Sequence, residues 1–313
     1  MTRQYFQQPN QVRVTLEDRN FMNQYRTGLV FGTTVGYPCC TANMHQGWPK
    51  FVQNLWYATA DNGLAALVYG ASEVKAKVGS GQEVSIVEQT DYPFKDKIKF
   101  TINIQGRLKF PLHLRIPLWC RNASISVNGK TIDIAAKNNI AIINREWSNG
   151  DNVELSLPME IKYSRWAQNS LGIERGPLVY ALKIEEDWRK VTQIVYRYQG
   201  IDYYETFWEI LPKSDWNYAL IRKEVDKQNF KIEVKDKIPD YPWNLANAPI
   251  TMTTLASRLP LWGIERGSAG KIPASPGIKV SANIQDLSKD GIKEITLIPY
   301  GCTKLRISQF PVH

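Results

Sequence analysis

The sequence is poor in the features that mark several common protein classes. Four cysteines in 313 residues are too few for a disulfide framework, and neither a Cys-x-x-Cys nor a His-Glu-x-x-His pattern occurs. No apolar run approaches the roughly 18 residues that a membrane helix needs, and the first residues have no signal-peptide core. We therefore expect free or metal-bound thiols, no membrane partner, and a location that is cytoplasmic or, in a bacterium, periplasmic.

Charge and aromatic content limit the classes of binding partner that the sequence predicts. The net charge is +9, but the lysines and arginines are scattered along alternating segments rather than gathered in one stripe. This distribution predicts a solvated surface and no nucleic-acid partner. Ten Trp, fifteen Tyr and ten Phe suit β-sheet cores and also surfaces that stack on sugar rings.

Hydrophobic periodicity predicts a mostly β chain with one or two helices near its start. Residues 43 to about 60 have helical spacing, with Phe51, Leu55 and Ala58 on one stripe and Thr41 or Asn43 as the cap. The period then changes to two, and Asn128-Gly129 is a strong hairpin turn. The predicted strands are 64–69, 73–78, 83–88, 97–104, 108–118, 124–127, 140–144 and 153–157. Strands without helical crossovers predict an antiparallel β-sandwich.

A second all-β unit is expected after a boundary near residues 163–170. Residues 185–248 are rich in aromatic side chains and irregular in pattern. Strands return at 230–234, 250–254, 278–282, 294–300 and 305–307. The predicted division is therefore residues 1–60 with the helix, 61–165 as one sandwich and 166–313 as a second.

Two adjacent cysteines, Cys39 and Cys40, stand where the helical pattern begins. Thiolates are good zinc ligands and good nucleophiles, and the bend at Pro38 lets both sulfurs reach one ion. A closed zinc site needs about four ligands, and Cys120 and Cys302 are poor candidates because they lie in separate predicted strands. From spacing alone, the alternative of two buried structural cysteines is favoured.

The run from Cys39 to Phe51 (CCTANMHQGWPKF) resembles the C-terminal part of the β-L-arabinofuranosidase family, glycoside hydrolase family 127. Further matches, in the family's order, are GLAALVYG at 63–70, TDYPF at 90–94, LHLRIP at 112–117 and ERGPL at 174–178. The resemblance implies an (α/α)6 barrel followed by β-sandwiches, of which residues 1–60 would be the last part of the barrel.

The resemblance also implies a chemistry. Cys39 matches the nucleophile and Cys40 the adjacent ligand of a zinc thiolate, which an upstream Glu-x-Cys pair completes. A separate upstream glutamate is the general acid/base, and configuration is retained through a covalent thioglycoside. The implied substrates are arabinofuranosides or related plant-type glycans.

This sequence departs from the family before Cys39. It contains no Glu-x-Cys pair there, and Glu17 is the only upstream glutamate. We therefore expect an incomplete zinc site and a C-terminal portion that is catalytically silent alone, with a possible homodimer through a sandwich. Two other classes stay open, namely a non-catalytic glycan-binding or dimerisation module and, more weakly, the tail of a polysaccharide lyase.

Three further residues are candidate substrate contacts. The indole of Trp48 could stack on a sugar and the imidazole of His45 could bind its hydroxyls, while Trp48 could instead pack the first helical turn. Tyr37, just before the cysteines, could approach the substrate or belong to a core. His113, on a predicted strand, is interpreted as structural.

Overall fold

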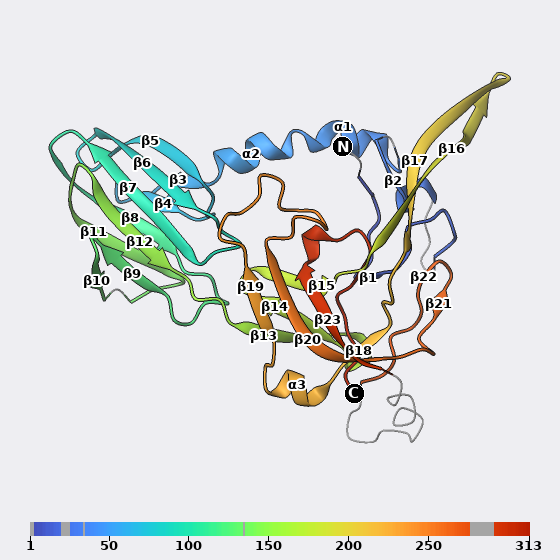
Figure 1. Ribbon diagram of the computed structural model, residues 1–313. Coiled ribbons are helices and arrows are strands. Elements are labelled where there is room, and N and C mark those ends of the chain that lie inside the picture. The colour runs from blue at the N-terminus through green and yellow to red at the C-terminus, as the bar shows by residue number, and fades with distance from the viewer. Residues whose placement is uncertain (1–2, 20–25, 34, 134, 276–290) are drawn as a thin grey trace. The chain divides into compact units, whose positions relative to one another are not determined.

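The structure is a computed structural model that describes residues 3–19, 26–33, 35–133, 135–275 and 291–313. The chain divides into two compact units, the middle unit Met44–Glu160 and the terminal unit, which joins Met1–Asn43 to Ile161–His313. Both are built mainly from β-strands (Figure 1). The predicted mostly β fold, with short helices ahead of antiparallel sheets, is confirmed.

The middle unit is a two-sheet sandwich. One sheet has the strand order β10-β9-β12-β7-β6-β5 and the other β11-β8-β4-β3, and buried side chains from both, such as Phe100 and Leu112, form one core. All pairs are antiparallel except β4 with β8. Its elements are α2 Gly47–Gln53, β3 Trp56–Ala58, β4 Leu64–Ala66, β5 Ser72–Val78, β6 Gln82–Thr90, β7 Lys97–Ile104, β8 Arg107–Arg115, β9 Ser124–Val127, β10 Lys130–Ile132, β11 Ile140–Ser148 and β12 Asp151–Ser156.

Local sequence explains much of this sandwich. In β7 the apolar residues Ile98, Phe100 and Ile102 are buried and the intervening residues face outward, as a period of two requires. Asn128 and Gly129 have φ values of +50° and +77°, which is the geometry of a tight hairpin turn between β9 and β10. The predicted turn is confirmed.

The terminal unit gathers strands from both ends of the chain. Its largest sheet has the order β13-β14-β15-β23-β20-β18, with β19 also pairing with β20, and smaller sheets are β16-β17-β2, β1-β24 and β21-β22. Its elements are β1 Asn10–Gln11, η1 Arg26–Leu29, β2 Phe31–Gly32, α1 Pro38–Met44, β13 Ile161–Arg165, η2 Ala167–Asn169, β14 Leu171–Arg175, β15 Leu178–Leu182, β16 Glu186–Tyr198, β17 Ile201–Pro212, β18 Tyr218–Leu220, α3 Arg222–Asp226, β19 Lys231–Val234, β20 Ile250–Arg258, β21 Ile264–Glu265, β22 Ser268–Ala269, β23 Ile292–Pro299, η4 Tyr300–Cys302 and β24 Arg306–Ile307.

Strand pairing joins the N-terminal segment to this unit. β1 pairs with β24, β2 pairs with β17, and Val14 exchanges backbone hydrogen bonds with Ile210. The divisions in the structure fall at residues 43 and 160. The division at residues 60 and 165 stays a prediction about the family's domains, and the expected strand at 278–282 lies outside the described residues.

The expectation of irregular structure across residues 185–248 was wrong at its start. β16 and β17 form a long two-stranded ribbon that extends from the terminal unit (Figure 1). Gln199 and Gly200 turn it with φ values of +49° and +77°. Ile194, Ile201 and Tyr204 near its tip are exposed. The apolar residues there therefore do not belong to a hydrophobic core.

The single helix predicted from residue 43 to about 60 was also wrong. The chain forms α1, then α2, and then enters β3, which pairs with β4. Asn43 does not cap a helix start, since it lies inside α1 and donates to the carbonyl of Cys39 at 2.8 Å. Among the described residues, the helices are too short or too polar to span a bilayer.

Candidate functional site

Cys39 and Cys40 lie in α1, directly after Pro38, and both thiols are exposed. Their sulfurs are 3.9 Å apart. Two thiolates on one tetrahedral zinc ion, with Zn–S bonds of about 2.3 Å, would stand about 3.8 Å apart. The pair therefore fits two corners of a zinc site, and it is not the buried structural pair that spacing alone had favoured.

A third residue joins the cysteines from far away in the sequence. The hydroxyl of Tyr5 lies 3.3 Å from the sulfur of Cys40, and this hydrogen bond raises the pKa of Tyr5. The rings of Tyr5 and Tyr37 are in contact, with centroids 4.6 Å apart, and Phe6 meets Tyr37 edge-on at 6.1 Å. Sequence reasoning missed Tyr5, because no local pattern reports a contact across 35 residues.

Tyr37 is thus half-buried in an aromatic cluster beside the thiols. Its backbone carbonyl and that of Val35 accept hydrogen bonds from the guanidinium of Arg3, at 3.4 and 2.9 Å. These contacts hold the segment that leads into α1. A role of Tyr37 in substrate contact stays a prediction.

His45 and Trp48 belong to the middle unit, and both are exposed. Trp48 is 68% exposed and meets Phe51 edge-on at 6.3 Å within α2. The structure therefore brings Tyr37, Cys39 and Cys40 together with Tyr5. His45 and Trp48 belong to the other unit. Their contact with a sugar stays a prediction.

The other potential ligands that the structure describes do not complete a zinc site. In the described part of the chain, no three His, Cys, Asp or Glu side chains gather closely enough to hold a metal ion. Cys120 is buried in the middle unit, and burial raises the pKa of Cys302 to about 11, which disfavours its thiolate. Nε2 of His113 lies 3.0 Å from a carboxylate oxygen of Asp61, a hydrogen bond that agrees with its structural interpretation.

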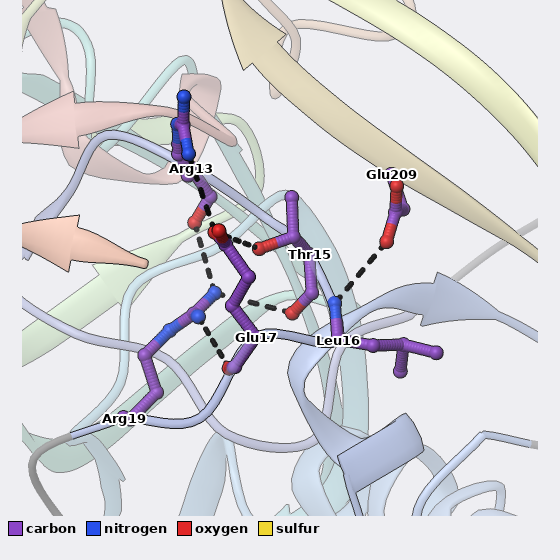
Figure 2. A network of polar contacts seen from close by, with 6 residues as sticks. All are labelled: Arg13, Thr15, Leu16, Glu17, Arg19 and Glu209. Atoms are coloured by element: carbon purple, nitrogen blue, oxygen red, sulfur yellow. Dashed lines mark hydrogen bonds and ion pairs between the residues drawn. The ribbon is translucent and has the colours of Figure 1, made fainter. Parts of the chain in front are cut away.

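Glu17, the only glutamate before Cys39, is held in a polar network that Figure 2 shows. Its carboxylate accepts hydrogen bonds from Arg13 at 3.3 Å and from the hydroxyl of Thr15 at 3.0 Å. Glu209 of β17 accepts from the backbone N–H of Leu16 at 3.2 Å. These bonds engage the Glu17 carboxylate with its neighbours in the same loop.

The centre of this network is Arg19, which is buried. Its guanidinium donates to the carbonyls of Glu17 at 2.6 Å and Thr15 at 3.2 Å, and burial lowers its pKa. Gly267 leaves the space for this guanidinium, since a Cβ there would collide with Nη1 of Arg19. The network thus fixes the loop before the candidate site.

We expect Arg19→Ala to lower the free energy of unfolding by about 2–3 kcal/mol, because the buried carbonyl of Thr15 and the part-buried carbonyl of Glu17 lose their donor. Arg13→Ala, which removes only an exposed ion pair with Glu17, should cost less than about 1 kcal/mol. Urea unfolding of both variants measures the difference. Equal midpoints for the two variants would contradict the structural role of Arg19.

Comparison with known proteins shows a likeness to one family over part of the chain. Residues 63–159 match the family model described as the β-L-arabinofuranosidase GH127 middle domain. The chain resembles the GH127 β-L-arabinofuranosidase family. This confirms the resemblance predicted from the sequence, over the strands β4 to β12 of the middle unit.

Solved structures extend the likeness in fold. Ara127N-Se, a GH127 β-L-arabinofuranosidase from Geobacillus stearothermophilus T6, shares 22% identity over 91% of this chain, with a TM-score of 0.61. A protein described as a glycoside hydrolase shares 20% identity over 97%, with a TM-score of 0.62, and a GH127 β-arabinofuranosidase shares 20% over 88%, with a TM-score of 0.56. The chain spans only 39%, 44% and 39% of these three structures. No curated protein matches the chain.

Proposed function

We propose that this chain is the C-terminal portion of a retaining glycoside hydrolase that acts on arabinofuranoside-type glycans through a cysteine nucleophile. The observation that carries the proposal is the exposed pair of sulfurs, 3.9 Å apart, of Cys39 and Cys40. The match to the GH127 middle domain and the GH127-like fold support it.

In the proposed reaction, the thiolate of Cys39 attacks the anomeric carbon and the glycosidic C–O bond breaks. The departing oxygen takes a proton from a general acid, and Glu17 is not assigned this role because its carboxylate accepts hydrogen bonds from Arg13 and Thr15. Water then displaces the sulfur and restores the thiolate. Tyr5 orients Cys40 through its hydroxyl.

The two thiols would hold zinc, which when bound keeps the nucleophilic sulfur deprotonated at neutral pH. They would supply two of about four ligands, and among the described residues no cluster of three His, Cys, Asp or Glu side chains supplies the rest. We therefore propose that the 313-residue polypeptide alone is catalytically silent. Release of sugar from an aryl β-L-arabinofuranoside by this chain alone would contradict that part.

Cobalt titration tests the metal pair without relying on activity. We expect Co²⁺ to produce thiolate charge-transfer absorption in the wild-type chain, and Cys39→Ser or Cys40→Ser to abolish it. Cys120→Ala removes a buried thiol and should leave the absorption unchanged. An identical spectrum for all four proteins would contradict the zinc-thiolate proposal and would favour a non-catalytic module instead.

A further inference from the structure

The terminal unit contains an open cleft of about 460 Å³ on one face of its largest sheet. Ser164 of β13 lies opposite Gly172 of β14, and Glu174 of β14 lies opposite Val179 of β15. Because residues two apart on a strand share a face, Gly172 and Glu174 form adjoining parts of the same floor. Tyr300 and Gln309 line the cleft from the C-terminal segment.

Trp166 forms a fixed aromatic platform in this cleft. Its indole N–H donates to the hydroxyl of Ser164 at 2.9 Å. The ring lies against Gly172, since a Cβ there would stand 3.0 Å from the indole nitrogen and 2.7 Å from the oxygen of Ser164. Trp166 nevertheless remains 55% exposed. An indole that is both anchored and exposed loses little conformational freedom when a ligand covers it.

The turn that follows Trp166 is held in an uncommon conformation. Gln168 and Asn169 each have a φ of +57°, and Arg165 donates to the backbone and side-chain oxygens of Asn169 at 3.2 and 3.0 Å. Consecutive left-handed residues other than glycine are unfavourable unless the surroundings hold them. Here they return the chain to β14 while the platform stays in place.

The lining of the cleft is amphipathic. Apolar atoms of Pro177, Leu178 and Val179 lie beside the polar side chains of Glu174 and Gln309, and Glu174 is the one charged residue among the described lining residues. A sugar ring has the complementary character, with an apolar C–H face for the indole and hydroxyls for a carboxylate and an amide. A single carboxylate does not suit a phosphate or another anion. The volume lies within the roughly 300–1,000 Å³ of small-molecule sites.

We propose that this cleft binds a neutral saccharide, with one ring stacked on Trp166 and its hydroxyls hydrogen-bonded to Glu174 and Gln309. The site would hold a glycan chain on the terminal unit. It does not depend on Cys39, Cys40 or a metal ion, so it can be tested apart from the proposed hydrolase chemistry.

Affinity electrophoresis of the folded 313-residue chain tests the cleft, with soluble arabinan, arabinoxylan or galactan as the probe in the gel. We expect at least one polymer to retard the wild-type chain. Trp166→Ala should weaken binding about tenfold or more, and Glu174→Ala should weaken it by a smaller factor. Trp166→Phe keeps an aromatic face and should retain part of the affinity. Tyr241→Ala removes an aromatic ring that is 78% exposed and does not line the cleft, so it should bind as the wild type does.

Melting curves of each variant distinguish lost binding from lost folding. If Trp166→Ala is unfolded, Glu174→Ala tests whether the cleft binds the glycan. Three outcomes overturn the proposal. The first is wild-type migration that none of the three polymers alters. The second is equal retardation of the wild type and the cleft variants. The third is retardation that disappears in Cys39→Ser or with a chelator, which would assign glycan binding to the thiol site.

Discussion

Trp147→Ala is expected to lower the free energy of unfolding of the middle unit by about 3–5 kcal/mol. Trp147 is fully buried in the core between the two sheets, and its indole N–H donates to the carbonyl of Phe110 at 2.9 Å. The ring of Phe110 packs against it at 5.8 Å, and the guanidinium of Arg145 lies 5.2 Å from its centroid. Truncation leaves a cavity and an acceptor without its donor.

Urea unfolding followed by circular dichroism measures this loss. Trp48→Ala is the matched control, because it removes the same side chain from an exposed position in the same unit and should cost less than about 0.5 kcal/mol. Trp147→Phe should fall between the two. The core assignment fails if Trp147→Ala is as mild as Trp48→Ala.

Stability of the middle unit should also fall as the pH rises from about 4.5 to about 7, because of Glu88. This side chain of β6, opposite Ser72 of β5, is buried, and burial raises its pKa from the ordinary 4.5 to about 7. Its oxygens accept from the backbone N–H of Gly70 at 2.9 Å and the hydroxyl of Ser72 at 3.5 Å, which offsets only part of the desolvation.

The sign follows from proton binding. Between these two pKa values the folded chain holds a proton on Glu88 that the unfolded chain releases. The stabilisation by neutral Glu88 is therefore fully present below about pH 4.5 and is lost as the pH rises through about 7. The size is about 3 kcal/mol, since each pKa unit corresponds to about 1.4 kcal/mol.

Glu88→Gln should remove this pH dependence and raise stability at pH 8, because the amide is neutral at every pH. Glu83→Gln alters an exposed carboxylate on the same strand and should leave the wild-type profile in place. Melting temperatures across pH 4 to 8, compared among the three proteins, give the answer. Parallel profiles for wild type and Glu88→Gln would show that Glu88 is ionised at no cost in the folded chain.

Much of the middle unit was predictable because its signals are local. β7 and β9 begin and end at the residues that alternation predicts, and Asn128-Gly129 turns the chain as its chemistry requires. Leu55 and Ala58 also matched a helical stripe, yet Trp56–Ala58 became a strand. Its partner β4, on the same sheet as β8, supplies hydrogen bonds that outweigh local helical periodicity.

Long-range contacts explain why several features of the terminal unit were not predicted from the sequence. The ribbon of β16 and β17 carries exposed Ile194 and Tyr204 near its tip, so its pattern gave no alternation between core and solvent. Tyr5 reaches Cys40 only because β2 and its neighbours return the N-terminal segment to α1. These arrangements depend on which distant segments pair, which spacing does not encode.

By itself the sequence determined a strand-rich chain, the tight turn at Asn128-Gly129, and a vicinal thiol motif. Those properties follow from side-chain period, backbone preference and the chemistry of sulfur, which act within a few residues. Only the tertiary structure decided that both sulfurs are exposed at zinc-like spacing, that Glu17 is tied to Arg13, and that Trp166 is anchored over Gly172. Each of these depends on side-chain conformations and contacts in the folded chain, which residue spacing alone does not encode.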